Sequence, residues 1–266
     1  MLMSDSHLFF RFTRLWDYVH ILVLLFPVIY LISPADIFTI KTLVVFAANL
    51  CLTAYGYMYN DLEDAVDDYH DLEKRKRNPV ANGEITRNQS YLANLVLLCV
   101  GLALLAYVSV FALALGVVFA VVGFLYSWRP LRLKSTPIWD VISHVLFLGV
   151  QQLLITYVAF KPLDLLVVPY LMIIVPFSLM NEIMHELLDF EVDRETEVSN
   201  TVQRFGGFDV KKLLVILSLL VVGGAAIIVY SLSAQYRVVG LGISLVIVVP
   251  AIVQMKGRVD RITQSG

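Results

Sequence analysis

Long blocks of apolar residues fill most of the chain, and short polar segments separate them. Each block is close to the ~20 residues that an α-helix needs to cross the core of a bilayer. The pattern therefore predicts an all-α integral membrane protein with a single domain over residues 1–266. Eight blocks predict eight membrane spans: Leu15–Ile32, Phe38–Tyr59, Tyr91–Val108, Phe111–Trp128, Ile138–Val158, Leu163–Met184, Lys212–Leu232 and Val238–Val253.

The composition agrees with a membrane protein. Hydrophobic residues make up 59% of the chain, charged residues 16%, and the mean hydropathy is +0.77. A soluble domain has roughly 45–50% apolar and about 25% charged residues. The net charge of −2 offers no bulk attraction to nucleic acid. Cys51 and Cys99 both lie in apolar blocks, where we expect packing residues rather than a disulfide.

The basic residues predict the orientation. With the N-terminus inside, the segments on the inner side hold 17 of the 20 lysines and arginines. Such an excess is the positive-inside signal of a multi-pass protein. We therefore expect both termini, and the long charged connections after the second, fourth and sixth spans, to be cytoplasmic.

The first of two acidic segments follows the second span. Asn60, Asp64 and Asp68 recur every four residues and so share one face of a helix, with Asp61 beside them. Like charges placed in this way repel one another, so a cation is needed to stabilise them. A hard divalent ion with oxygen ligands is the natural candidate, and Mg²⁺ binds through one or two carboxylates plus a substrate phosphate.

The second acidic segment ends the sixth span. Glu182, Glu186, Asp189 and Asp193 also share a helix face. The two segments, 61–73 and 182–197, together hold 14 of the 22 acidic residues. This concentration at the cytoplasmic ends of two spans predicts the functional site.

Two basic loops lie on the same side of the membrane. Lys74–Pro79 follows the first acidic segment, and Tyr126–Lys134 follows the fourth span. Each loop has a simple alternative role, as a topological anchor for anionic lipid head groups or part of the interfacial aromatic belt. Fixed cations beside two carboxylate clusters are, however, what a metal-bridged phosphate requires. Within the fifth span, Asp140 and His144 lie four residues apart and could pair with each other.

These segments resemble a known family. N-D-L-E-D-A-V-D-D at Asn60–Asp68 is similar to the N-D-x-x-D-x-x-x-D signature of the UbiA superfamily of intramembrane prenyltransferases. Asp189–Asp193 resembles its second motif, D-x-x-x-D, and Tyr126–Lys134 its Y-S-x-x-P-x-x-L-K loop. Lys74–Gly83 resembles the loop after the first motif. The order of the motifs agrees over roughly residues 10–255.

The resemblance implies a helical bundle around a central cavity and an enzyme that transfers a polyprenyl group from a polyprenyl diphosphate. Its acceptor would be lipophilic or aromatic, and the allylic C–O bond would ionise first. The implied Mg²⁺ ligands are Asn60, Asp64, Asp68, Asp189 and Asp193, the four aspartates being catalytic. The implied substrate-binding residues are Asp61, Lys76, Arg77, Tyr126, Lys134 and Glu186.

Two features depart from the family pattern. The family usually has nine spans where this sequence predicts eight, and the segment between Asp193 and Thr201 is about one residue longer than is common. Two other functions remain open at this stage. A terpene cyclase of the same superfamily would use the same diphosphate site without an acceptor, and a cation transporter would use the carboxylates without chemistry.

Overall fold

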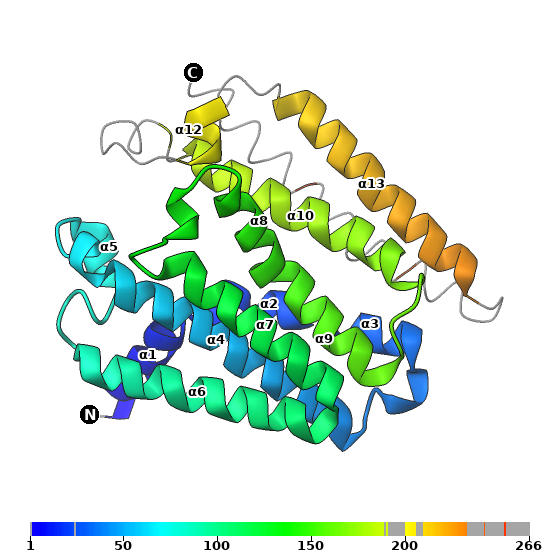
Figure 1. Cartoon of the computed structure of the whole chain (residues 1–266), viewed down its shortest axis with the longest axis horizontal. Helices are drawn as coiled ribbons and strands as arrows, with labels where there is room; N and C mark the ends of the chain where they lie inside the picture. Colours follow the sequence, from blue (N-terminus) through cyan, green and yellow to red (C-terminus); the bar gives the residue numbers. More distant parts are fainter. Residues whose placement is uncertain are drawn as a thin grey trace. The chain divides into compact units, whose positions relative to one another are not determined.

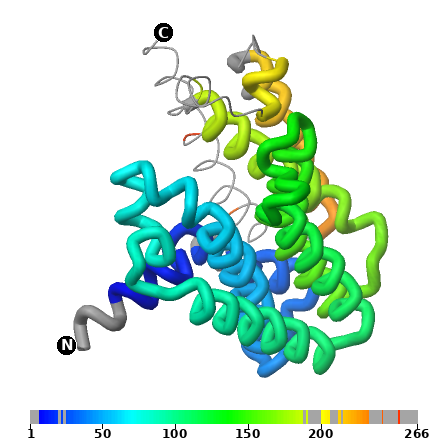
Figure 2. The backbone as a smooth tube through the Cα atoms, turned by 60° about the vertical axis from the view of Figure 1, so that its left-hand side comes forward, coloured from blue at the N-terminus to red at the C-terminus, as the bar shows by residue number. Residues whose placement is uncertain are grey.

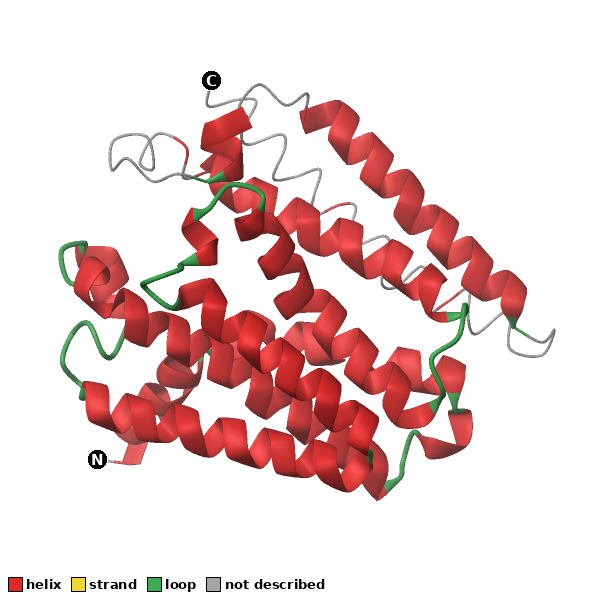
Figure 3. Ribbon diagram, viewed as in Figure 1, coloured by secondary structure: helices red, strands yellow, loops and turns green. Residues whose placement is uncertain are grey.

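The computed structural model describes residues 2–23, 25–188, 190, 200–205, 210–232, 242 and 253. All regular structure in these residues is helical, which confirms the predicted all-α class (Figures 1 and 3). The chain is a multi-pass membrane protein, because five of its helical segments are long and apolar enough to cross a bilayer: Ile40–Asp68, Arg87–Val108, Val110–Ser127, Trp139–Phe160 and Val167–Leu187.

The described helices can be compared with the predicted spans. The first predicted span corresponds to α2 (Leu15–Val23) and α3 (Leu25–Ile32), which lie on either side of residue 24, a position outside the described residues. The seventh corresponds to α13 (Val210–Ser231), and the eighth lies outside the described residues except for positions 242 and 253. The total of eight or nine spans, the central cavity and the cytoplasmic orientation therefore stay predictions.

The chain divides into two compact units. Unit 1 comprises Met1–Phe26 and Ala35–Leu133, and unit 2 comprises Pro27–Pro34 and Lys134–Gly266. The helices of unit 1 are α1 (Leu2–Thr13), α2, α4 (Ile40–Asp68), α5 (Leu72–Arg77), α6 (Arg87–Val108) and α7 (Val110–Ser127). Unit 2 contains α3, α8 (Trp139–Val145), the π-helical turn η3 (Leu146–Val150), α9 (Gln151–Phe160), α10 (Val167–Leu188), α12 (Thr201–Phe205) and α13. Two 3₁₀ turns complete the set, η1 (Pro34–Asp36) and η2 (Leu133–Ser135).

Helix α4 organises unit 1. Its 29 residues make it about 43 Å long, which exceeds the roughly 30 Å of a bilayer core. The apolar block ends at Tyr59, so the last turns extend past it and carry the first acidic segment in helical register. Helices α6 and α7 run alongside α4 (Figures 1 and 2). The ring of Tyr59 stacks on Phe124 of α7 with a centroid distance of 5.1 Å.

Side-chain caps explain where several helices of unit 1 begin. Asp71 accepts hydrogen bonds from the backbone N–H of Lys74 (3.0 Å) and Glu73 (2.9 Å), and so starts α5. These two bonds hold the pKa of Asp71 below its usual value. Thr86 and Gln89 form a capping box at the start of α6. Ser109 ends α6 and caps α7, which makes the connection between these two spans very short.

Helices α10 and α13 form a closely packed pair in unit 2. Met180 and Met184 of α10 are fully buried and pack with Leu217 of α13. Farther along the pair, Gly224 faces α10 so closely that a Cβ atom built on it would lie 2.5 Å from the carbonyl oxygen of Pro169. Small residues at such crossings let two membrane helices approach closely.

We predict that Gly224→Ala destabilises the protein by about 1–3 kcal/mol, because the added methyl group meets a backbone atom that cannot move away easily. The control is Gly223→Ala, where the nearest atom to the added Cβ is the end of the Met172 side chain at 3.5 Å. This control should be neutral or stabilising by up to about 1 kcal/mol. Unfolding titrations in detergent measure both, and equal stabilities for the two variants would contradict the packing described.

Candidate functional site

The first acidic segment forms a network of polar contacts on α4. The amide nitrogen of Asn60 donates to Asp64 Oδ2 at 3.1 Å, as their spacing of one helical turn allows. The amide oxygen of Asn60 accepts a hydrogen bond of 2.9 Å from the hydroxyl of Ser127, the last residue of α7. The amide of Asn60 thus contacts Asp64 through its nitrogen and α7 through its oxygen, and Ser127 fixes its orientation.

Two arginines that follow α7 supply the cations that the acidic segment requires. Arg132 Nη2 lies 3.0 Å from Asp64 Oδ1 and 2.9 Å from Asp67 Oδ2. Arg129 Nη2 pairs with Asp67 Oδ1 at 3.0 Å. The backbone N–H of Arg129 also donates to the buried carboxylate of Glu63 at 3.3 Å. The loop that follows α7 is therefore bound to the acidic end of α4 by charge-assisted hydrogen bonds.

A buried asparagine joins the segment after α5 to the same end of α4. Asn78 Nδ2 donates to Asp68 Oδ2 at 2.9 Å and to the backbone carbonyl of Asp61 at 2.7 Å. Its amide oxygen accepts from the backbone N–H of Val80 and Ala81. Asn78 therefore uses both ends of its amide, and it sets the position of one carboxylate oxygen of Asp68.

Asp61 is directed toward a different partner. Its carboxylate is buried and accepts a hydrogen bond of 3.1 Å from Arg14, which also binds Asp17 at 2.6 Å. Arg14 lines a cavity of about 270 Å³ in unit 1 together with Arg77. Arg77 thus lines a cation-rich cavity together with Arg14, the partner of Asp61. The remaining lining residues are His7, Phe10, Arg11, Trp16 and Asp17.

In unit 2, carboxylates of α8 and α10 bind the beginning of α12. Asp140 is fully buried and accepts hydrogen bonds from the backbone N–H of Thr201 at 2.6 Å and from its hydroxyl at 2.5 Å. Glu186 accepts from the backbone N–H of Val202 at 2.8 Å. Glu186 was predicted to bind substrate, and the structure shows it holding backbone that follows the second acidic segment.

The expected pairing of Asp140 with His144 does not occur. His144 Nδ1 lies 2.7 Å from Glu182 Oε2 on α10, while both carboxylate oxygens of Asp140 are used by Thr201. The reason is that α10 packs directly against α8 and offers His144 a carboxylate from another helix. Glu182 and Glu186, one turn apart on α10, thus both have partners within unit 2.

The other predicted site residues are placed as follows. Lys76 is exposed and pairs with Glu73 at 2.7 Å, so its contact is on the surface of α5. Tyr126 lies in the last turn of α7, and Lys134 lies in η2 as part of unit 2; both are half-buried. Asp189 and Asp193 lie outside the described residues.

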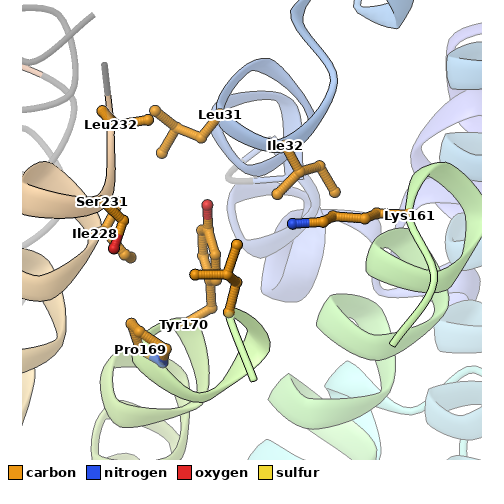
Figure 4. Close-up of a pocket in the computed structure, with 9 residues that line it drawn as sticks. Leu31, Ile32, Lys161, Pro169, Tyr170, Ile228, Ser231 and Leu232 are labelled. Atoms are coloured by element: carbon orange, nitrogen blue, oxygen red, sulfur yellow. The ribbon is translucent and has the colours of Figure 1, made fainter. Parts of the chain in front are cut away.

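A second cavity lies near the first turn of α10, at the end of that helix away from Glu182 and Glu186. It measures about 90 Å³, and Lys161 and Tyr170 point into it among apolar side chains of α3 and α13 (Figure 4). Lys161 pairs with Asp164 at 3.0 Å. Among the residues that the structure describes, no acidic side chain lines this cavity.

Several contact residues were not singled out from the sequence. Arg129 and Arg132 were part of the recognised basic loop, but Lys134 was preferred because it matches the family motif. Ser127 belongs to the same motif, and Asn78 belongs to the loop after the first motif, so both could have been identified from the sequence. Arg14 gave no signal beyond its contribution to the charge bias.

Comparison with known proteins agrees with these motifs. The sequence matches the UbiA prenyltransferase family over residues 21–265. No curated protein matches the chain by sequence. Several solved structures share its fold, among them the following three. A UbiA homologue from Archaeoglobus fulgidus bound to GPP and Mg²⁺ is 21% identical, with a TM-score of 0.67 over 92% of this chain and 85% of that one.

The second is a digeranylgeranylglyceryl phosphate synthase, 18% identical, with a TM-score of 0.68 over 98% of this chain and 92% of that one. The third is a UbiA homologue from Aeropyrum pernix K1 without ligand, 19% identical, with a TM-score of 0.66 over 91% and 90% of the two chains. At these identities the likeness shows the fold, and the family follows from the sequence match over nearly the whole chain. On that match, together with the motifs and the helical fold, the chain belongs to the UbiA prenyltransferase family.

Proposed function

We propose that this protein transfers a prenyl group from a polyprenyl diphosphate to a lipophilic or aromatic acceptor in the membrane, with a divalent metal ion, Mg²⁺, as cofactor. The observation that carries this proposal is the contact between the first acidic motif and a fixed cation. Asn60 and Asp64 present oxygen donors at the end of a membrane-length helix, and the guanidinium of Arg132 lies 3.0 Å from Asp64. A diphosphate bound through a metal ion needs oxygen ligands for the metal and a cationic side chain for its own oxygens, and the two must lie close together.

The donor set fits a hard cation in its chemistry. Asn60, Asp64 and Asp68 offer only amide and carboxylate oxygens, which are the ligands that Mg²⁺ prefers. Among the described residues, no group of three or more acidic, histidine or cysteine side chains is arranged to hold a metal by itself. Asp189 and Asp193, which lie outside those residues, remain proposed metal ligands. When bound, Mg²⁺ would neutralise negative charge on the leaving diphosphate.

The chain's own residues would contribute in three ways. Arg132 and Arg129 keep positive charge beside the motif, where negative charge develops as the allylic C–O bond breaks. Asn78 fixes the orientation of Asp68. The apolar spans keep water from the resulting allylic carbocation until the acceptor attacks it and releases a proton. Lys76, Arg77, Tyr126, Lys134, Asp61 and Glu186 remain proposed substrate-binding residues.

The proposed reaction is tested by incubating the purified protein in lipid nanodiscs with Mg²⁺ and prenyl diphosphates, with and without a panel of acceptors. Prenylated acceptor is the expected product. A cyclic hydrocarbon formed without any acceptor would instead identify a terpene cyclase. Mg²⁺ flux into proteoliposomes in the absence of a prenyl diphosphate would identify a transporter.

We predict that Asp64→Asn lowers kcat/KM on the order of a hundredfold, since it removes the charge from an oxygen ligand while keeping its shape. The control is Glu73→Gln in the same acidic segment. The exposed side chain of Glu73 pairs with the exposed Lys76, so this change should leave kcat/KM within about twofold. Size-exclusion chromatography checks that both purified variants are folded and monodisperse. Normal turnover by Asp64→Asn would refute its assignment as a ligand.

We also predict that Asn78→Ala lowers both stability, by about 1–3 kcal/mol, and kcat/KM. The substitution leaves the buried backbone N–H of Val80 and the carboxylate of Asp68 without their amide partner. Asn82→Ala serves as the control, because the Asn82 side chain accepts a hydrogen bond from the backbone N–H of Glu84 within its own loop. Thermal unfolding and steady-state kinetics measure the two effects. Unchanged kinetics in Asn78→Ala would show that Asp68 does not depend on this contact.

A further inference from the structure

A single nitrogen of Arg132 serves two carboxylates of the acidic segment. Nη2 lies 3.0 Å from Asp64 Oδ1 and 2.9 Å from Asp67 Oδ2. The side chains of Arg132 and Asp64 are 32% and 16% exposed, so this ion pair is only partly screened by water. Asp64 belongs to the motif shared with the family, whereas Asp67 lies between the motif positions. Arg132 therefore connects a proposed metal ligand with a carboxylate that the motif does not include.

The backbone of Arg132 adopts an unfavourable conformation to make this contact. Its φ angle is +41°, in the left-handed region that residues with a Cβ atom rarely occupy. The backbone N–H of Arg132 donates to the carbonyl of Trp128 at 2.7 Å, which closes a tight turn directly after α7. Such strain persists only where the surrounding contacts stabilise it, and it concentrates at functional sites. Here the stabilising contacts are the two ion pairs.

A divalent ion and Arg132 compete for Asp64. Both are cations, and both would lie within contact distance of the same carboxylate, where like charges repel strongly. In the absence of metal, the guanidinium offsets the repulsion between carboxylates of the segment. Asp67 offers a position that Arg132 can keep when Asp64 binds metal, and Arg129 holds Asp67 in place at 3.0 Å.

We propose that Arg132 is the resident counter-ion of the metal-free site. It neutralises Asp64 until a divalent ion arrives, then gives up Asp64 while keeping Asp67, so that its charge becomes available to the diphosphate. This inference rests on the proposed function for the identity of Asp64 as a metal ligand. It assigns Arg132 two opposite effects, competition with free metal ion and attraction of the diphosphate.

The test measures Mg²⁺ affinity without any substrate, from the rise in unfolding temperature as Mg²⁺ is added to the purified protein. Arg132→Gln should have a lower unfolding temperature than the parent without metal and should bind Mg²⁺ about threefold to tenfold more tightly. Arg129→Gln is the matched control. It removes the same charge from the same loop, but the Arg129 side chain pairs with Asp67 and its backbone N–H donates to Glu63, so its Mg²⁺ affinity should stay within about twofold of the parent.

The second measurement uses inorganic diphosphate in the presence of saturating Mg²⁺. Here Arg132→Gln should bind about tenfold more weakly than the parent, because a charge-assisted contact to the phosphate is lost. If Arg132→Gln fails to fold, Arg132→Met replaces it, because methionine keeps the length of the side-chain stem. This variant should also bind Mg²⁺ more tightly and diphosphate more weakly than the parent. Opposite changes in the two affinities support the proposal.

Equal or weaker Mg²⁺ binding by Arg132→Gln than by Arg129→Gln would overturn the proposal, since direct competition at Asp64 would then be absent. Asp64→Asn should abolish the Mg²⁺ response of the parent, and an unchanged response would overturn both this inference and the proposed metal site. Failure of the parent to transfer a prenyl group, with the two affinity changes intact, would contradict the proposed reaction alone.

Discussion

The structure of unit 1 depends on how the carboxylates at the end of α4 are compensated. Five of them lie within eight residues, where like charges on neighbouring turns destabilise a helix. Each of the four aspartates has a partner: Arg14 binds Asp61, Arg132 binds Asp64 and, together with Arg129, Asp67, and the amide of Asn78 binds Asp68. Glu63 accepts from the backbone N–H of Arg129. These partners come from the α1–α2 junction, from the loop after α7 and from the segment after α5. The acidic helix end therefore holds three otherwise separate connections of the chain in place.

Much of this arrangement could be predicted from the sequence, because it depends on local periodicity. Apolar blocks predicted helices, and the four-residue spacing of Asn60, Asp64 and Asp68 predicted a common face with a cation on it. Which basic side chains contact these carboxylates could not be predicted. Arg132 and Arg14 reach their carboxylates from backbones with φ of +41° and +52°, and no propensity predicts such conformations for arginine. Comparison with the family motif favoured Lys134 instead. A motif records which residue types recur at each position, but it does not record which side chains contact each other.

The spans show the same limit. A block of apolar residues indicates that a helix can cross the membrane, but breaks within the block depend on packing against neighbours. The fifth block contains the π-helical turn η3, in which Leu148 leaves helical φ/ψ values. Likewise, the spacing of Asp140 and His144 allowed a pair within one helix. The carboxylate of Glu182 on α10 provided a partner for His144 that only the tertiary structure reveals.

Both acidic segments are followed by chain that returns to bind the helix carrying them. After the first segment, Asn78 donates to the side chain of Asp68 and to the backbone of α4. After the second, the backbone N–H of Val202 donates to Glu186 of α10, while Thr201 binds Asp140 of α8. A helix end loses hydrogen bonds and frays unless other groups supply partners. Because the ligands proposed for the metal lie near these ends, a returning segment that binds the helix restricts fraying where the geometry of the ligands matters most. The contacts outside the two motifs thus determine how rigidly the motifs themselves are held.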